Sequence, residues 1–337
     1  MSAPATVAVG DLEDLVATAL AHAGTSGPNA ASVSRALVTA EIDGQKGHGL
    51  SRVASYAAQV RAAKIDGRAI PVSVRTRPGT IAIDAAHGFA FPALDLAVRE
   101  LPAMAREVGI AAAGITRSHH AGALGLVAER LADADLVALL FANTPSAMAP
   151  WGGRRGLFGT NPISFSAPRR PGPPIGVDLA LSQGAPGQIL AAAQKKDAIP
   201  LGWAVDKDGR PTTDAQAALE GTLTPAGGAK GAALALMVEL LAAAVTGSRL
   251  AHEATSFLDA EGAPPATGQL IIALDAAALG AGDGLADRIA TFADLIEAEP
   301  GARLPGARRH ALRDTARRHG VSVDAQTMVT LTRLAGL

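Results

Sequence analysis

A histidine between two glycines is the strongest candidate for acid/base chemistry in this sequence. His48 lies in the run Gly47-His48-Gly49-Leu50-Ser51-Arg52, and the glycines free the backbone for close approach to a ligand. Arg52 follows four residues later, at a predicted helix start, so the two side chains can share one side. An imidazole beside a guanidinium suits a carboxylate ligand next to a group that exchanges a proton. The alternative is a loop histidine beside a solvated arginine.

A pair of histidines marks a second candidate site. Residues 115–125 read ITRSHHAGALG, after an apolar, strand-like run and before a helix. A strand, a polar turn and a helix N-terminus commonly form an anion or cofactor site. Neither His119 nor His120 has an Asp, Glu or Cys nearby at a matching ligand spacing, so no metal is expected. The alternative is a satisfied polar turn.

Three further segments carry groups that suit small ligands. Residues 143–162 are rich in Gly and Pro and poor in charge, and they offer Thr160 and Asn161 as hydrogen-bonding groups. Lys230 lies in a glycine-rich run before a long apolar helix and suits a phosphate or carboxylate. The arginines of 303–309 suit a phosphate. The alternatives are an Asn-Pro turn, an ordinary helix entry and a solvated charged face.

Hydrophobic periodicity predicts the elements that must position these side chains. Helices are predicted over 11–24, 28–43, 50–64, 92–108, 122–134, 229–246, 285–298, 307–319 and 324–334. Strands are predicted at 110–115, 136–142, 163–167, 175–179 and 269–273, and a hairpin turning at Pro78-Gly79 within 72–85. The mixture indicates an α/β or α+β fold. The glycine fingerprints of an ordinary Rossmann site and of a P-loop do not occur in the sequence.

Composition excludes several classes of function. The 337 residues include 30 Lys+Arg against 31 Asp+Glu, which argues against a nucleic-acid binder and a polybasic membrane anchor. The lack of cysteine excludes disulfides, a thiolate nucleophile and Cys-ligated metals. The longest apolar run, 231–247, is interrupted by Glu239 and favours a buried helix over a membrane span. No signal peptide is visible, and we expect a cytoplasmic protein, with two domains from its length.

Seven segments, in this order along the chain, resemble those of a known family: AEIDGQKGHGLSR, ITRSHHAGALG, ANTPSAMAPWGGRRGLFGTNPISF, DLALS, GRPTTD, TPAGGAKG and RLPGARR. Together they resemble the malate/L-lactate dehydrogenases with a non-Rossmann fold. That family includes sulfolactate and ureidoglycolate dehydrogenases, diketogulonate reductases and piperideine/pyrroline-2-carboxylate reductases. The resemblance covers roughly residues 10–335.

The resemblance implies an NAD(P)-dependent oxidoreductase built from a central sheet domain, which binds the cofactor, and a helical domain from both termini. The expected parts are an N-terminal helical part (1–75), a central NAD(P)-binding sheet domain (76–250) and a largely helical C-terminal segment that returns to the first domain (251–337). The resemblance also implies a homodimer, with the site near the subunit interface.

The resemblance assigns roles to individual residues. His48 matches the proton donor and acceptor, Arg52 the residue that grips the substrate carboxylate, and Thr160 a substrate contact. The cofactor contacts match His120, Ala121, Gly122, Ala123, Leu124, Asp178, Leu179, Ala180, Lys230, Arg303, Leu304, Pro305, Gly306, Ala307, Arg308 and Arg309. The sequence leaves NADP and NAD both open, and Arg308 and Arg309 favour NADP because they suit a 2′-phosphate.

Two positions depart from the family pattern. Many members have Ser before the histidine as a relay partner, where this chain has Gly47. The ketimine-reducing branch has an acidic relay residue, where this chain has Gln188, and a neutral amide cannot take a proton as a carboxylate can. The Gly-His-Gly variant looks more like the sulfolactate-type branch.

We therefore expect hydride transfer between a nicotinamide and C2 of a small 2-oxo or 2-hydroxy acid of the malate, lactate or sulfolactate type. Two alternatives stay open: a cyclic ketimine reductase, and a family member that binds the cofactor without catalysis.

Overall fold

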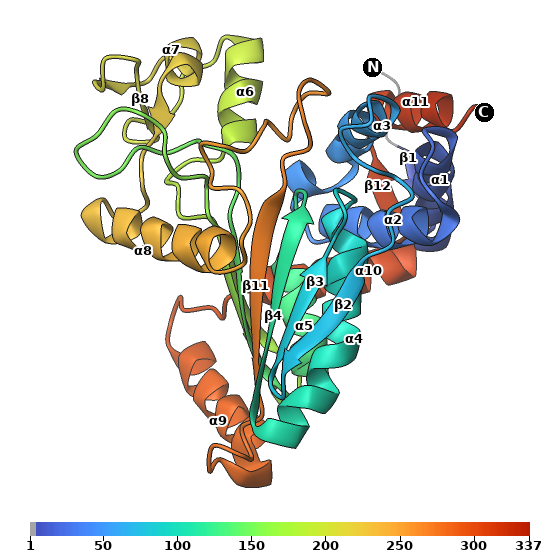
Figure 1. Ribbon diagram of the computed structural model, residues 1–337, viewed down its shortest axis with the longest axis vertical. Coiled ribbons are helices and arrows are strands. Elements are labelled where there is room, and N and C mark those ends of the chain that lie inside the picture. The colour runs from blue at the N-terminus through green and yellow to red at the C-terminus, as the bar shows by residue number, and fades with distance from the viewer. Residues whose placement is uncertain (1–4) are drawn as a thin grey trace.

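A seven-stranded sheet, a helical layer beside it and a small outer unit make up the computed structural model, which describes residues 5–337 (Figure 1). In the view of Figure 1 the helical layer lies to the right of the sheet and the outer unit lies above it to the left. This arrangement confirms a mixed α/β fold with a central sheet and a helical unit drawn from both ends of the chain.

The central sheet is mixed, with the order β2-β3-β4-β11-β5-β6-β7. Only β3 and β4 are parallel, and every other neighbouring pair is antiparallel. Its strands are β2 (Val72–Arg77), β3 (Thr80–Asp84), β4 (Ile110–Ser118), β5 (Val137–Ala142), β6 (Ile163–Ala167), β7 (Ile175–Leu179) and β11 (Thr267–Leu274). The predicted strands and hairpin are all present, and β4 continues beyond its expected end toward the histidine pair.

The place of β11 was not foreseen. This strand lies antiparallel between β4 and β5, although it comes from the C-terminal segment that was expected to be largely helical. Ile271 and Ala273 pack into the cluster with α4 and α5, and Leu270 packs into the cluster with α8, as expected for a strand covered on both faces. Residues 251–337 therefore supply a central strand before their helices reach the helical layer.

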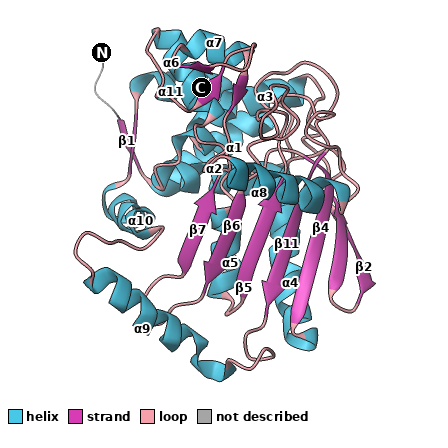
Figure 2. Cartoon of the chain, turned by 90° about the vertical axis from the view of Figure 1, so that its left-hand side faces the viewer, coloured by secondary structure: helices cyan, strands magenta, loops and turns pink. Residues whose placement is uncertain are grey.

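Helices cover both faces of the sheet (Figure 2). On one face lie α4 (Ala90–Val108) and α5 (Gly125–Asp133), and on the other lie α8 (Ala229–Glu239) and its π-helical continuation (Leu240–Ala244). Many buried positions of the sheet are alanines, which allow close packing: Ala111, Ala113, Ala138 and Ala273 are fully buried.

Several predicted helices differ by one to three residues at their ends from those observed, and two differences have a structural cause. The helix expected over 229–246 passes into the π-helical turn after Glu239. The helix expected from residue 122 starts at Gly125, because Gly122 has a left-handed conformation with φ of +64°. The residues before Gly125 are thereby kept in an open turn at the end of β4.

The helical layer joins the two ends of the chain. Its helices are α1 (Val9–His22), α2 (Gly27–Ile42), α3 (Val53–Arg61), α10 (Ala307–His319) and α11 (Ala325–Leu334). A short antiparallel pair, β1 (Ala5–Val7) with β12 (Val321–Val323), was not predicted. Arg313 on α10 donates to both oxygens of Asp43, each at 2.7 Å, and to Glu129 at 2.7 Å. One guanidinium therefore ties α10 to the residue after α2 and to α5 of the sheet domain.

The outer unit is a part of the chain for which the periodicity predicted no elements. It contains α6 (Pro186–Lys195), α7 (Ala215–Glu220), β8 (Ala204–Val205), β9 (Pro211–Thr212) and β10 (Thr222–Leu223). The strands have two residues each, too few to show a period of two. Ile189, Ile199 and Leu223 pack into a hydrophobic cluster that also holds Val238 of α8, so the unit is fixed on the sheet domain.

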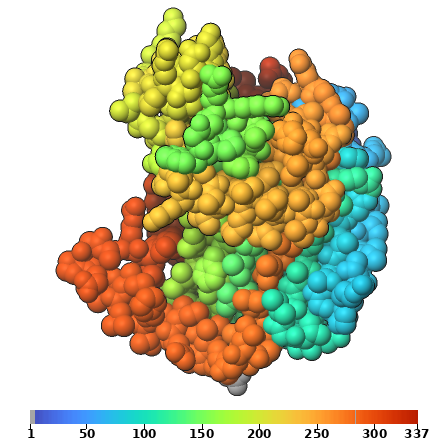
Figure 3. Space-filling view, turned by 60° about the vertical axis from the view of Figure 1, so that its left-hand side comes forward, coloured from blue at the N-terminus to red at the C-terminus, as the bar shows by residue number. Residues whose placement is uncertain are grey.

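A separate arm follows β11. The arm comprises a short 3-10 turn (Gly282–Gly284) and α9 (Leu285–Ala298), and Figure 3 shows it projecting at the lower left of the body. Phe292 and Leu295 on α9 are each 63% exposed. Among the described residues, no helix has both the length and the apolar character needed to cross a membrane.

Candidate active site

The elbow that carries His48 consists of two short 3-10 turns, Lys46–His48 and Leu50–Arg52, directly before α3. Gly49 joins them where the chain passes against α2. A Cβ atom at this position would lie 3.0 Å from Cα of Glu41 and would overlap its carboxylate, so only glycine fits. The same carboxylate accepts a hydrogen bond from the backbone N–H of Leu50 at 3.1 Å. The elbow is thus fixed to α2 by a close contact that requires glycine.

His48 forms a chain of hydrogen bonds with two other rings. Its Nδ1 atom lies 3.2 Å from Nε2 of His120, and the two imidazoles stack with centroids 5.1 Å apart. Nδ1 of His120 lies 2.6 Å from the hydroxyl of Tyr56. Tyr56 is fully buried, His120 is 7% exposed and His48 is half-buried. Nε2 is the nitrogen that His48 keeps available for a ligand.

The environment keeps these groups uncharged in the free protein. Burial, with a smaller contribution from the charge of Arg52, lowers the pKa of His48 to about 4. Burial and the same charge hold the pKa of His120 well below its usual value. Burial raises the pKa of Tyr56 well above its usual value. At neutral pH the hydrogen-bonded row of His48, His120 and Tyr56 therefore consists of two neutral imidazoles and a phenol.

Arg52 lies next to this chain. Its Nε donates to the carbonyl oxygen of Gly47 at 2.7 Å, which orients the guanidinium along the elbow. Among the side chains that the structure describes, no carboxylate forms an ion pair with Arg52. A half-exposed guanidinium beside a neutral imidazole suits a carboxylate ligand that carries an oxygen at the next carbon.

A segment before β11 covers the histidine pair. The ring of Phe257 lies 4.9 Å from that of His119 and 5.4 Å from that of His120, measured between centroids. Gln59 on α3 donates to the carbonyl oxygen of Phe257 at 3.0 Å, and its amide oxygen lies 2.8 Å from Nε2 of His119. The fully buried Lys64 pairs with Asp259 at 3.0 Å. The segment is therefore fastened to the helical layer beside the site.

Sequence reasoning missed Tyr56, Gln59 and Phe257. Tyr56 carried a usable signal, because it is the only tyrosine of the chain and follows Arg52 by one helical turn. Phe257 is far from the elbow in sequence, so only the tertiary structure brings it there.

Thr160 lies on the long irregular segment, where another threonine holds it. The hydroxyl of Thr144 accepts from the backbone N–H of Thr160 at 2.9 Å and lies 3.3 Å from its hydroxyl. A Cβ atom on Gly159 would overlap the backbone carbonyl of Thr144, so this close approach also requires glycine.

A buried carboxylate supports this segment from α8. Glu239 is 4% exposed and accepts hydrogen bonds from the side-chain amide of Asn161 at 2.8 Å, from that of Asn143 at 3.3 Å and from the backbone N–H of Ala251 at 2.7 Å. Burial raises its pKa, while the bond from Asn161 opposes that shift. Both ends of the segment are thus fixed to one side chain.

The turn after His120 meets Asp178 and Arg309. Asp178 accepts from the backbone N–H of Gly125, at the start of α5, at 2.9 Å and from the side chain of Gln45 at 3.5 Å. Arg309 donates to the carbonyl oxygen of Gly176 at 3.4 Å. A Cβ atom on Gly125 would lie 2.6 Å from Nη1 of Arg309. Gln45 therefore links this carboxylate to the elbow that carries His48.

The remaining predicted cofactor residues fall into two groups. Ala121, Ala123 and Leu124 are buried and form the turn itself, and Gly122 lies against Phe91. The others differ in exposure: Leu179, Ala180, Lys230, Arg303, Pro305, Ala307 and Arg308 are exposed, Leu304 is buried and Gly306 is half-buried. Gly306 lies beside Arg309, since a Cβ atom on it would be 2.9 Å from Nη2. Arg308 is exposed, whereas Arg309 is half-buried and donates to Gly176. Among the described residues no cluster of three or more His, Cys, Asp or Glu is arranged to hold a metal ion.

The profile of malate/L-lactate dehydrogenases matches residues 7–332. The chain belongs to the malate/L-lactate dehydrogenase family. The family resemblance of the sequence is thereby confirmed, and the chain is an oxidoreductase of this family.

Relatives within the family differ in their named reactions. The chain is 47% identical over 308 residues to a (2R)-3-sulfolactate dehydrogenase (NADP(+)) of Chromohalobacter salexigens, with 91% of each chain covered. It is 39% identical over 337 residues to a Δ1-pyrroline-2-carboxylate reductase of Ancylobacter novellus, covering 99% of this chain and 98% of the relative.

Two solved structures of the family share the fold over nearly the full length. The Δ1-piperideine-2-carboxylate reductase of Pseudomonas syringae pv. tomato has a TM-score of 0.93 at 38% identity, covering 98% of this chain and 99% of that one. The sulfolactate dehydrogenase of Methanocaldococcus jannaschii has a TM-score of 0.90 at 28% identity, covering 99% and 98%. The fold of this chain is therefore shared with these two dehydrogenase and reductase structures.

Gln188 and Gly47, the two positions that depart from the family pattern, are both exposed. Gln188 is exposed, and its amide oxygen accepts from the backbone N–H of Ala185 at 3.4 Å, so it caps the start of α6. Gly47 is exposed on the elbow, and a Cβ atom there would meet no atom within 4 Å.

Proposed function

We propose that this protein transfers a hydride between NADP(H) and C2 of a small 2-oxo or 2-hydroxy acid, with a sulfolactate-type acid as the first candidate. The observation that carries the proposal is the placement of His48. Its Nδ1 is bonded to His120, its Nε2 is available, and the guanidinium of Arg52 lies beside it. These are the groups that a 2-oxo acid needs: a cation for the carboxylate and a proton donor for the adjacent oxygen.

Arg52 binds the substrate carboxylate in this proposal and thereby also controls His48. Its charge is one of the two causes of the low pKa of His48 in the free protein, after burial. A bound carboxylate offsets that charge, so the pKa of His48 rises and the imidazole takes up a proton from solvent. Substrate binding thus prepares the acid that reduction needs.

His48 then acts as acid or base at Nε2. In reduction, the hydride reaches C2, the C2–O double bond becomes a single bond, and the imidazolium gives its Nε2 proton to the oxygen. The products are the 2-hydroxy acid and a neutral His48. In oxidation, the tautomer of neutral His48 with its hydrogen on Nδ1 takes the hydroxyl proton at Nε2 as the hydride leaves C2. Thr160, held by Thr144 and by the amide network of Glu239, orients the substrate.

The residues around Asp178, namely Gln45, Gly125 and Arg309, fit a dinucleotide. Nη1 of Arg309 and the amide oxygen of Gln45 are buried without a hydrogen-bond partner among the described side chains. Arg309 also lies in a niche where a side chain on Gly125, Gly176 or Gly306 would collide with it. We propose that the 120–124 turn, Asp178 and Arg309 hold the cofactor, with Lys230 and the 303–308 loop at its outer parts. When bound, the cofactor supplies or accepts the hydride.

A cyclic ketimine reductase is the second candidate. It is favoured by the pyrroline-2-carboxylate reductase that resembles this chain over nearly its full length. The place of Gln188 opposes it, because a neutral amide that caps α6 cannot serve as a proton relay.

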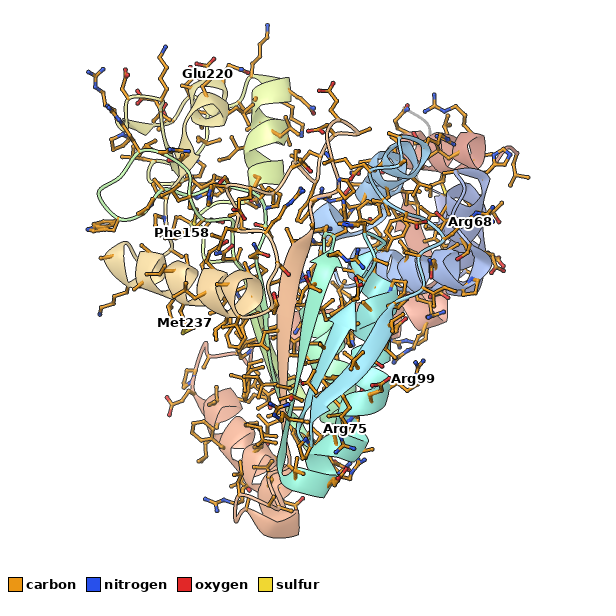
Figure 4. All side chains as sticks on the ribbon, viewed as in Figure 1. Arg68, Arg75, Arg99, Phe158, Glu220 and Met237 are labelled. Atoms are coloured by element: carbon orange, nitrogen blue, oxygen red, sulfur yellow. The ribbon has the colours of Figure 1, made fainter. Side chains whose placement is uncertain are left out.

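We also propose a homodimer in the cytoplasm. An apolar face on α8 supports the dimer, since Leu234, Leu236, Met237 and Leu240 are between 38% and 49% exposed. Figure 4 shows Met237 on the opposite side of α8 from Phe158, which packs inward. Light scattering at several concentrations would test the dimer, and a monomer throughout would contradict it.

A substrate panel tests the proposed function. NADPH oxidation is measured with sulfopyruvate, pyruvate, oxaloacetate and Δ1-piperideine-2-carboxylate, and repeated with NADH. We expect turnover with at least one 2-oxo acid and higher kcat/KM with NADPH. Turnover with the cyclic imine alone would establish the second candidate. Cofactor binding without turnover on any of the four would overturn both.

A further inference from the structure

Tyr56 is enclosed by aromatic rings. Its ring centroid lies 5.4 Å from that of Phe89, 6.4 Å from that of Phe91, 5.9 Å from that of His119 and 6.2 Å from that of His120. The side chain is fully buried. Its hydroxyl therefore has no access to solvent, and its hydrogen bonding must be satisfied within the protein.

The hydroxyl has a single hydrogen-bond partner among the described residues, Nδ1 of His120 at 2.6 Å. If the hydroxyl only accepted, its own hydrogen would be buried without an acceptor, which is costly. The hydroxyl therefore donates to Nδ1 in the free protein. His120 must then carry its hydrogen on Nε2 and donate it to Nδ1 of His48. His48 is left with its hydrogen on Nε2.

We propose that Tyr56 is a positioning residue whose hydroxyl, acting through His120, fixes which nitrogen of His48 carries the hydrogen. The inference rests on the proposed acid/base role of His48 and adds a residue that touches neither substrate nor cofactor. Tyr56 stays a phenol throughout, because burial raises its pKa well above the usual value of a tyrosine.

A hydroxyl suits both protonation states of His48. When His48 is protonated, its Nδ1 carries a hydrogen and must donate to Nε2 of His120. His120 then carries its hydrogen on Nδ1 and donates it to the oxygen of Tyr56. A hydroxyl can donate to Nδ1 of His120 in the first arrangement and accept from it in the second, so Tyr56 is neutral in both, although the second leaves its own hydrogen without an acceptor. A phenylalanine at this position can do neither.

None of the charged groups around the three rings can replace the hydroxyl of Tyr56 as the hydrogen-bond partner of His120. Arg52 faces all three rings as a cation and cannot accept a hydrogen bond. The charge of Lys64 lowers the pKa of His119, and Lys64 is paired with Asp259. Glu41 accepts from the backbone of Leu50 and lies 4.0 Å from Lys46, so its carboxylate is occupied outside the chain.

Nitrogen-15 spectra of the histidine rings test this inference in the full-length protein, without cofactor or substrate. The variant is Tyr56→Phe, which keeps the ring packing and removes the hydroxyl. Its matched control is Ser164→Ala, which removes another buried hydroxyl, one that donates to Val177 and touches no histidine. In the wild type and in Ser164→Ala we expect His48 and His120 to carry hydrogen on Nε2. In Tyr56→Phe we expect His120 to populate both tautomers.

A kinetic measurement complements the spectra. We expect Tyr56→Phe to lower kcat about tenfold while the Kd for NADPH stays within about twofold of the wild type. A wild-type His120 with its hydrogen on Nδ1, or unchanged tautomers in Tyr56→Phe, would overturn the inference. The wild-type spectrum alone shows which nitrogen of His120 carries the hydrogen, so it tests the inference even if the variant fails to fold. The spectra need no turnover. If the substrate panel shows no activity, the proposed function is therefore overturned, while the hydrogen positions assigned to His48 and His120 are not.

Discussion

Nδ1 of His48 lies 3.2 Å from Nε2 of His120, and the two rings stack within 15° of parallel. The first ring comes from the elbow of the helical layer, and the second comes from the end of β4 in the sheet domain. The proposed acid/base residue is thus held by the joint between the two parts of the molecule, and its protonation depends on contacts from both.

Removal of the His48 imidazole should abolish most of the activity. We expect His48→Ala to lower kcat about a hundredfold or more, because no other group can exchange the proton at the same position. The Kd for NADPH, measured by fluorescence titration, should stay near the wild-type value. His22→Ala, at an exposed histidine of α1, is the control and should leave both constants unchanged. Undiminished turnover in His48→Ala would rule out the assignment.

Arg52 should affect both substrate affinity and the acidity of His48. We expect Arg52→Gln to raise KM for the 2-oxo acid about tenfold to a hundredfold, since a charge-assisted hydrogen bond is lost. The variant should also raise the pKa of His48, because it removes one cause of the low value. Arg52→Lys keeps the charge and serves as the control, in which the pKa should change less. An unchanged KM in Arg52→Gln would contradict the proposed carboxylate contact.

The pH dependence of 2-hydroxy acid oxidation follows from the environment of His48. Oxidation needs the neutral imidazole, which is present above the pKa and lost as the pH falls through it. Since burial and Arg52 lower that pKa to about 4, kcat/KM should stay level from pH 8 to about pH 5 and then fall. A profile of initial rates in constant ionic strength measures it. An acidic limb centred near pH 6.5, the value of an ordinary histidine, would show that the site does not lower the pKa.

The two glycines beside His48 should tolerate substitution very differently. Gly49→Ala places a methyl group against Cα and the carboxylate of Glu41, so we expect a loss of about 1–3 kcal/mol of unfolding free energy and a lower kcat. Gly47→Ala meets no atom within 4 Å and should change stability by less than about 0.5 kcal/mol. Urea unfolding of the two variants measures the difference, and equal stability would contradict the observed contact with Glu41.

The carboxylate of Glu239 should support the substrate contact at Thr160 from a distance. In Glu239→Gln, an amide N–H faces a donor from Asn143, Asn161 or Ala251, which costs about 1–3 kcal/mol of stability. Because Asn161 adjoins Thr160, we expect KM for the substrate to rise while the Kd for NADPH is unchanged. Glu220→Gln, at the exposed end of α7 labelled in Figure 4, is the control. A variant with wild-type stability and KM would contradict this network.

Local sequence patterns predicted most elements and the elbow, because helices and strands with a buried face show their period in the sequence. The pairing of His48 with His120 did not follow from the pattern, since it depends on how α3 and the end of β4 meet. The insertion of β11 between β4 and β5 is also a long-range property, as its residues mark it only as a buried strand. From the sequence, glycines such as Gly49 and Gly159 indicate only a backbone with free dihedral angles. The structure shows a different requirement, because a Cβ atom at either position would overlap a neighbouring residue.

The central position of β11 has a consequence for the order in which the protein can fold. During synthesis β4 and β5 emerge long before residues 267–274, so the strand that will lie between them is missing while both expose backbone groups and apolar side chains. Unpaired edges of this kind promote association between nascent chains. The helical layer is also incomplete at this stage, because α1 and α2 are synthesised first and α10 and α11, which belong to the same layer, are synthesised last. Stable folding is therefore a late event on the ribosome, and a chain released before β11 has an open sheet.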